Sequence, residues 1–297
     1  MKKMSISRAA HKPAHKPTHE QPTSQLTRIF SIVLVALLAI VWMFPIVWAF
    51  FTAFKSDHEI NTSDFHLLPE RWSLENFSAL LGNTEQTPVL RWFANSLVIA
   101  SGQTLLVLIL VALASYGYTR LQFRGRDALF TFLLGTMMFP TVLNLIPNYK
   151  IVDMLGWMNT PLAVIVPGAA GVYNIFLVQQ FVKGIPPELD EAAIVDGANH
   201  WQIFIHIILP LIRPALTVVA LFTFTGAWND FLWPSIVMSD TDSMPITPGL
   251  QLLQGQYETF PGIAIAGALI ALIPMLALFI FTQKYFMQAL SLSSGIK

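Results

Sequence analysis

Long apolar runs alternate with short polar stretches along most of this chain. A helix needs about 20 mostly apolar residues to cross the hydrocarbon core of a bilayer, and six runs are long enough. We therefore predict an all-α membrane protein with about six transmembrane helices. The predicted spans are Ile29–Phe51, Ser96–Tyr118, Ala128–Ile146, Pro161–Val182, Leu211–Trp233 and Ile263–Phe281.

Prolines interrupt several of these runs. Pro45, Pro140, Pro167 and Pro274 lie inside predicted spans, and we expect them to kink the helices, since proline removes one helical hydrogen bond. The first apolar run begins near Ile29 after a polar stretch. It lacks the pattern of a cleaved signal peptide, so we expect it to be retained as a span.

Composition agrees with a membrane protein. Hydrophobic residues make up 54% of the chain and charged residues only 11%, whereas soluble domains carry about 25% charged residues. Basic and acidic residues each number 17, so charge predicts no nucleic-acid partner, and membrane lipid is the expected surrounding. The absence of cysteine excludes disulfides, thiol catalysis and cysteine-based zinc sites.

Lysine and arginine placement predicts the orientation of the spans. With the N-terminus in the cytoplasm, thirteen of the 17 basic residues lie on the cytoplasmic side, and Lys55, Arg71, Arg91 and Lys150 lie outside. Cytoplasmic loops carry the excess of lysine and arginine. We therefore expect a protein of the bacterial cytoplasmic (inner) membrane with both termini inside.

The N-terminal tail, residues 1–25, is predicted to be a disordered basic segment. His11, His15 and His19 follow one another at four-residue spacing, which would place them on one helical face for a metal. Pro13 and Pro17 argue against that helix, so we expect no metal site.

Two predicted outer loops are long. The loop over about 55–91 is acidic and carries Trp72 and Trp92, and tryptophan near a span end is typical of the membrane interface. The loop over about 234–261 has no lysine or arginine and is rich in Gly, Pro and Gln. It is either a plain connector or a protein-binding loop.

The predicted cytoplasmic region over about 184–210 differs from a connector. Pro187 suits a first helical residue, and acids follow it in the first turn, where they complement the helix dipole. Gly197 can end this helix and Asn199 can cap the next one. We therefore predict two short helices at the cytoplasmic surface, the first presenting Leu189, Ala192, Ala193 and Asp196 on one face.

Two kinds of partner are possible for this first helix. A helix that lies on the membrane usually carries lysine and arginine on its polar face. This helix is acidic instead, with Glu188, Asp190 and Glu191 in its first turn, and an anionic inner leaflet would repel it. An acidic helix with small residues on one face fits a protein partner better.

The same region resembles the EAA loop of ABC importer permeases. The matching positions are Glu191, Ala192, Ala193, Gly197, Ile207, Leu209 and Pro210, at the spacing of that motif. The run Trp228–Pro234 is similar to the end of the fifth span in carbohydrate-uptake permeases, and Ser294–Lys297 is like the C-terminal tail of the maltose-permease type. The resemblance covers about residues 26–297.

The resemblance implies a type I ABC permease fold over 26–297 and a set of partners. A homologous second permease, an ATPase dimer and an extracellular or periplasmic sugar-binding protein are implied. Glu191 would form an ion pair with a basic residue of the ATPase, while Ala192, Ala193, Asp196, Gly197, Leu209 and Pro210 complete the coupling motif. The last outer loop would reach the binding protein's cleft.

A catalytic role for this chain is not expected. No Gly-Lys dipeptide occurs, so the chain lacks the P-loop that cradles nucleotide phosphates. By the resemblance, ATP and Mg belong to the partner ATPase, and this chain carries no cofactor of its own.

Several residues are candidates for the path of the sugar. Aromatic faces, amides and carboxylates bind sugars, and Trp228, Asn229, Asp230 and Trp233 supply these groups near the end of the fifth predicted span. Asn144, Asn174 and Tyr173 are further polar groups in apolar spans, for which hydrogen bonding between helices is the alternative. In the maltose type, most sugar contacts belong to the other permease.

Three other functions remain to be weighed. An ABC permease for a polyol or a glycerol phosphoester would share the same motif, although a phosphate ligand favours arginine or lysine at its site. A secondary transporter would normally need more spans and ion-coupling acids within the membrane. An intramembrane enzyme would need a carboxylate pair, a Ser/His pair or a metal cluster at one depth, and we predict none.

Overall fold

The computed structural model describes residues 25–62, 66–82, 87–169, 171–256 and 261–293. The chain divides into two compact units, Met1–Val47 and Trp48–Lys297. The regular structure of the described residues is helical throughout. The tail predicted to be disordered, with its three histidines, lies outside the described residues except for Gln25.

The helices follow one another with short connections. In chain order they are α1 (Gln25–Ala53), α2 (Asp57–Ile60), α3 (Glu75–Gly82), α4 (Val89–Arg120), α5 (Arg126–Thr136), the 3₁₀ turn η1 (Thr141–Asn144), α6 (Leu145–Met154), α7 (Leu162–Gly168), α8 (Val172–Lys183), α9 (Glu188–Val195), α10 (His200–Ile203), the π-helix η2 (Phe204–Ile208), α11 (Leu209–Leu211), α12 (Arg213–Asn229), α13 (Leu232–Val237), α14 (Ile246–Gln256) and α15 (Pro261–Ser293).

Three predicted spans are confirmed as single helices that are long and apolar enough to cross a membrane. The qualifying segments are Thr27–Ala53 of α1, Val89–Arg120 of α4 and Pro261–Gln283 of α15. Pro45 and Pro274 lie inside α1 and α15 without ending them.

The third predicted span is wrong as one helix. α5 ends at Thr136, and the segment from Thr141 to Met154 leaves it at an angle of 97°. Pro140 lies at this break, just before the 3₁₀ turn. Its ring disfavours a helical conformation for Phe139 and provides no amide hydrogen. The chain therefore bends at the proline where a kink was expected, but sharply enough to end the helix.

The fourth predicted span is also interrupted, and the fifth ends earlier than predicted. α7 and α8 are bent by 48°, and Pro167 lies in the last turn of α7. The segment His200–Leu211 meets α12 at 72°. α12 ends at Asn229, one residue before the extended Asp230, so Trp233 belongs to the separate helix α13 rather than to the end of the span. Counting each bent pair as one span gives up to six spans in the described residues.

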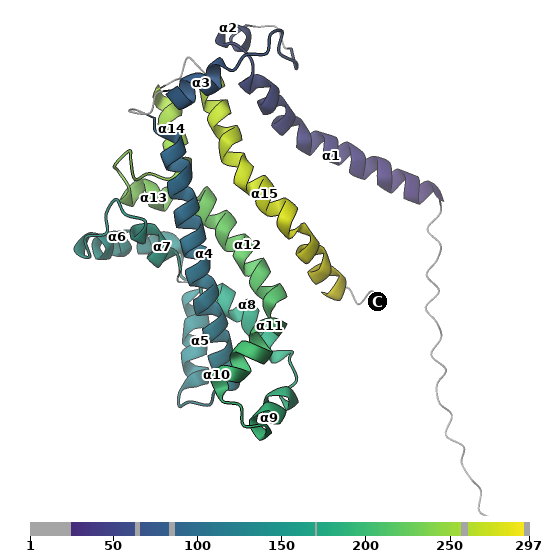
Figure 1. The fold of residues 1–297 in the computed structure, drawn as a ribbon, viewed down its shortest axis with the longest axis vertical. Coiled ribbons are helices and arrows are strands. Elements are labelled where there is room, and N and C mark those ends of the chain that lie inside the picture. Colours follow the sequence, from purple (N-terminus) through teal and green to yellow (C-terminus); the bar gives the residue numbers. More distant parts are fainter. Residues whose placement is uncertain (1–24, 63–65, 83–86, 170, 257–260, 294–297) are drawn as a thin grey trace, which may run out of the picture. The chain divides into compact units, whose positions relative to one another are not determined.

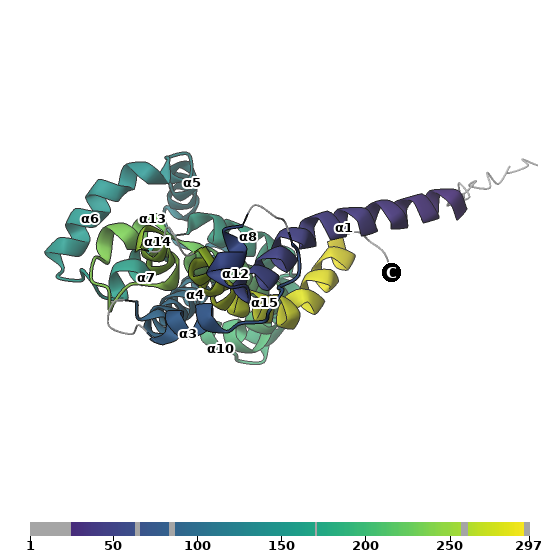
Figure 2. The same cartoon turned by 90° about the horizontal axis from the view of Figure 1, so that it is seen from above.

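The second unit is organised around α4. Figure 1 shows α4 running through this unit beside α12, and Figure 2 shows both near the middle when the unit is viewed end-on. The N-terminal half of α4 gives Trp92 and Ala100 to one buried cluster and Ile99 to a second. Its C-terminal half gives Val107, Val111 and other residues to a third.

Candidate functional site

The region that carries the motif folds into a short helix with an ordered end. α9 (Glu188–Val195) begins directly after Pro187, and its first turn carries three acids. Gly197 has a positive φ of 84°. The amides of Gly197 and Ala198 donate to the carbonyls of Ile194 and Ala193, at 3.0 and 2.9 Å. This is the Schellman pattern, in which glycine accepts the left-handed conformation without strain.

The next helix starts two residues later with a capping box. The Asn199 side chain accepts from the Gln202 amide at 2.9 Å, and the Gln202 side chain accepts from the Asn199 amide at 2.8 Å. Both reciprocal bonds satisfy helix-terminal amides. The predictions that Gly197 ends one helix and Asn199 caps the next are therefore confirmed.

Proline shapes the end of the motif. Pro210 cannot donate to the carbonyl of His206, and its ring would crowd that carbonyl. The turn before it, Phe204–Ile208, is a π-helix, the wider form that often occurs at functional positions. Leu209 and Pro210 are half-buried, and Leu209 packs on the cluster at the C-terminal half of α4.

The motif region is attached to α4 by polar contacts as well as by packing. Arg120, the last residue of α4, forms an ion pair with Asp190 at 2.7 Å and donates to the carbonyl of Ile185 at 2.7 Å. Tyr116, one turn earlier, donates to the carbonyl of His200 at 3.1 Å. These contacts hold the chain on both sides of α9.

The remaining surface of the motif region is exposed. Glu191, Ala192 and Asp196 lie open to the surroundings, whereas Ala193 is half-buried and packs towards the core. Of the predicted face, Leu189, Ala192 and Asp196 are therefore free to meet a partner. Apolar side chains extend this surface, with Val195 exposed by 86%; Ile194 and Trp201 are exposed as well.

A cavity of about 280 Å³ collects two of the candidates for the sugar path. Asp230 and Trp233 line it together with polar groups from other elements. The indole of Trp233 donates to the carbonyl of Ala163 at 2.9 Å, which holds the ring in place. The lining residues are Gln103, Thr141, Val142, Leu145, Asn148, Val164, Pro167, Gly168, Asp230, Leu232 and Trp233.

The other candidates lie away from this cavity. Trp228 is buried, donates to the carbonyl of Ala271 at 3.1 Å and packs against Phe93 and Phe224. Asn229 is exposed and donates to Thr225 in its own helix.

The two further asparagines are also absent from the lining of the cavity. Asn144 is exposed at the end of the 3₁₀ turn η1, and Asn174 is half-buried in the first turn of α8.

Sequence reasoning missed the polar groups that α4, η1 and α6 bring to the cavity. Gln103, Thr141 and Asn148 line it beside Asp230. Gln103 donates to the carbonyl of Gly168 at 3.2 Å, so α4 and α7 meet closely at this point. An isolated glutamine in an apolar span was a usable signal, but nothing local indicated that Asn148 would approach Asp230.

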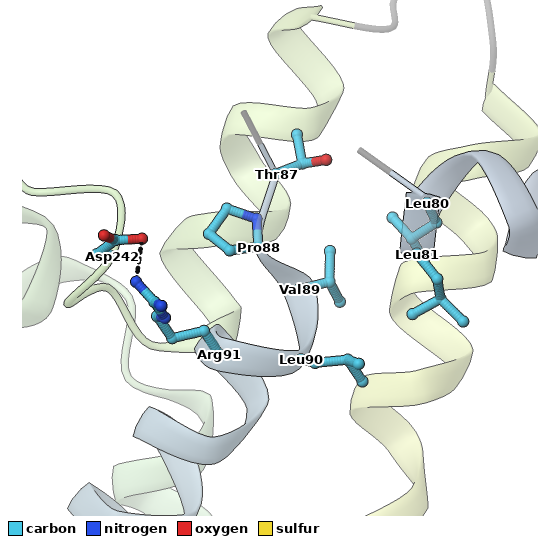
Figure 3. A pocket seen from close by; sticks show the side chains of 8 residues that line it. All are labelled: Leu80, Leu81, Thr87, Pro88, Val89, Leu90, Arg91 and Asp242. Carbon is cyan, nitrogen blue, oxygen red and sulfur yellow. Dashed lines mark ion pairs between the residues drawn. The ribbon is translucent and has the colours of Figure 1, made fainter. Parts of the chain in front are cut away.

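The last predicted outer loop is held by the N-terminal end of α4. The Trp92 indole donates to the Thr241 carbonyl at 2.7 Å, and the Asn95 amide donates to the carbonyls of Asp242 and Met244, both at 2.9 Å. Arg91 pairs with Asp242 at 2.6 Å, and both side chains line a pocket of about 480 Å³ (Figure 3). The start of this loop is therefore an ordered structure; residues 257–260 lie outside the described part.

Comparisons with known proteins agree with one another. The family described as "Binding-protein-dependent transport system inner membrane component" matches residues 19–291. The trehalose/maltose transport system permease protein of Thermococcus litoralis is 32% identical and covers 90% of this chain and 96% of its own. The arabinooligosaccharides transport system permease protein of Halalkalibacterium halodurans is 31% identical and covers 88% of this chain and 94% of its own.

A solved structure supports the fold. It is a bacterial ABC transporter involved in the import of the acidic polysaccharide alginate, 23% identical, with a TM-score of 0.78 over 89% of this chain and 99% of that chain. Together with the helical spans, these matches show that this multi-pass membrane protein belongs to the family of binding-protein-dependent transport system inner membrane components, the permease subunits of ABC importers.

Proposed function

We propose that this chain is the permease subunit through which an ABC importer carries a sugar, in the form of an oligosaccharide, into the cytoplasm. The observation that carries the proposal is the motif region, where Glu191 is exposed while its neighbour Asp190 is bound to α4. Relatives named for maltose, maltodextrin and arabinooligosaccharide transport support the substrate class.

The proposed complex contains several other proteins. A homologous second permease would complete the pathway, two ATPase subunits would bind the cytoplasmic motif regions, and a sugar-binding protein would deliver the substrate from outside. This chain is a non-catalytic subunit, because a P-loop sequence is missing from it. ATP and Mg bind to the ATPase, and we propose no cofactor for this chain.

The coupling role is assigned to the exposed part of α9. The exposed carboxylate of Glu191 can form a charge-assisted contact with a basic group. The exposed Leu189 and Val195 add apolar contact area. Gly197 shapes the end of this helix, and Leu209 with Pro210 shape the turn that follows. When the ATPases close on ATP, this surface is pulled with them and moves the attached spans.

The cavity beside Asp230 is proposed as part of the sugar path. A carboxylate, two amides and an indole ring offer hydrogen bonds and a stacking face to a sugar. Among the described residues that line the cavity, Asp230 is the one charged group. An acid there disfavours a phosphoester, which needs cationic partners, and so favours a neutral sugar.

The orientation follows from the distribution of lysine and arginine. We propose the bacterial cytoplasmic (inner) membrane as the location, with both termini and the motif region inside. The start of α4 with Arg91 and the loop with Asp242 then face outwards, where the binding protein delivers its sugar.

Affinity purification of the tagged chain from native membranes in mild detergent tests this assignment. Mass spectrometry is expected to find a P-loop ATPase and a second permease with it, and Glu191→Lys is expected to lose the ATPase while the chain stays in the membrane. Recovery of the native chain alone, under conditions that preserve other ABC complexes, would contradict the assignment. Any binding protein trapped with the complex can be screened against neutral and acidic oligosaccharides by calorimetry.

A further inference from the structure

The packing of α9 against the rest of the unit is too limited to fix its orientation. It has eight residues and contributes no fully buried side chain, and isolated helices of this length are unstable in water. Its apolar contact with the rest of the unit is limited to half-buried residues such as Ala193, with Ile185 and Ala198 on either side of the helix. A further interaction must fix its direction.

Arg120 supplies that interaction. Its Nε lies 2.7 Å from Asp190 Oδ2, as an ion pair rather than an aligned hydrogen bond. Its second terminal nitrogen donates to the Ile185 carbonyl at 2.7 Å. The two side chains are exposed by only 12% and 13%, unlike a typical surface pair.

The contact also joins two neighbouring segments of the chain to α4. Arg120 reaches the connection before α9 and the first turn of α9 at once, because a planar guanidinium can serve two acceptors in a fixed geometry. Asp190 Oδ1 is buried without a hydrogen-bond partner among the described residues. Arg120 is therefore the group that compensates this carboxylate.

We propose that Arg120 is a positioning residue that fixes the orientation of α9 relative to α4, so that a movement of α9 is transmitted to the span. Asp190 is its partner, and Tyr116 secures the far side through its bond to the His200 carbonyl. The inference rests on the proposed coupling role of the motif region for its functional meaning, while the positioning itself is a property of this chain.

The absence of cysteine allows a direct test on the full chain. Two cysteines, at the exposed positions Phe123 and Val195, are labelled with nitroxides, and pulsed electron spin resonance measures their distance in nanodiscs. We expect a narrow distance distribution in the otherwise native chain. Arg120→Ala is expected to broaden it, because the unpaired buried carboxylate then seeks water. The nearly isosteric Asp190→Asn is expected to broaden it too.

Arg124→Ala is the matched control, since it removes the same charge four residues later from an exposed site without an ion pair to a described residue. It is expected to leave the distribution narrow. A second readout is the amount of ATPase that co-purifies with each variant. It is expected to fall about tenfold for Arg120→Ala and to stay unchanged for Arg124→Ala.

The two readouts separate the two proposals. A narrow distribution in both Arg120→Ala and Asp190→Asn would overturn the positioning role, whatever the ATPase does. If the native chain captures no ATPase, the coupling function fails, and the distance measurement still decides whether Arg120 positions α9. Asp190→Asn replaces a single heavy atom, an oxygen by a nitrogen. It therefore still tests the positioning role if Arg120→Ala does not insert into the membrane.

Discussion

At the scale of single residues, Gly197 and Asn199 show how backbone position determines the role of a residue. Gly197 is needed for its positive φ, because other residues lose about 1–2 kcal/mol in this conformation. Its neighbour Asn199 is needed for its side-chain oxygen, which caps the next helix. Both roles follow from local chemistry, and both shape the turn between α9 and α10.

Gly197→Ala should destabilise the turn between α9 and α10 by about 1–2 kcal/mol. The added methyl group has open space around it, so the cost comes from the backbone conformation alone. Hydrogen exchange in nanodiscs should show faster exchange over 193–203, with little change elsewhere. Exchange equal to the native chain would contradict the conformational argument.

Asp57 provides a prediction of pH dependence. Burial raises the pKa of its carboxyl above the ordinary 3.8, and Glu75 adds to the rise. A raised folded-state pKa gives a stabilising contribution that is complete below pH 3.8 and lost as pH rises through the folded-state pKa. Asp57→Asn should therefore raise the unfolding midpoint at pH 7 and leave it unchanged near pH 3.

The measurement for Asp57 is thermal unfolding in detergent, followed by tryptophan fluorescence at both pH values. Glu70→Gln, in the same predicted outer loop, is the control, since Glu70 is exposed. A midpoint that falls equally at both pH values would show that Asp57 stabilises through shape or hydrogen bonding instead.

At the scale of elements, α4 is bound by side chains at both of its ends. Its N-terminal end binds the loop before α14 and the first residue of α14, through Trp92, Asn95 and Ser96. Its C-terminal end holds the motif region, through Tyr116 and Arg120. One helix, α4, therefore contacts both the loop before α14 and the motif region. These are the two segments that the proposed function assigns to the binding protein and the ATPase.

Asn95→Ala should loosen the loop at the N-terminal end of α4. It removes two hydrogen bonds to carbonyls, worth about 1 kcal/mol each. Hydrogen exchange over 241–246 should accelerate, while exchange over 188–203 should stay the same. Faster exchange over 188–203 as well would show that α4 transmits the change. Leu97→Ala, at an exposed position of the same helix, is the control and should leave the loop protected.

At the scale of the whole molecule, the proposed topology combines six spans with the distribution of basic residues. In that topology the motif region and the loop before α14 lie on opposite sides of the membrane, because α12 separates them. With each bent pair counted as one span, the bends at Pro140 and before Arg213 leave this alternation unchanged.

Labelling of single cysteines tests the topology, because the native chain has none. Ser239→Cys is exposed in the loop before α14, and Val195→Cys is exposed at the end of α9. A membrane-impermeant maleimide should label the first in intact spheroplasts and the second only after permeabilisation. The reverse pattern would invert the proposed orientation.

The sequence by itself determined the class of the protein, its apolar runs and the helix ends around α9. These features depend on local properties: apolar length against bilayer thickness, glycine at a positive φ and asparagine at a helix start. The motif residues were found for the same reason, since their spacing is a property of one short segment.

Only the tertiary structure decided which residues meet. Asp230 and Trp233 share a cavity with Gln103 and Asn148 because α4, α6, α7 and the start of α13 meet there, whereas Trp228 is directed into the core. Arg120 reaches Asp190 across 70 residues of sequence for the same reason. Such contacts depend on packing between helices that are distant in the sequence, which a local pattern does not specify.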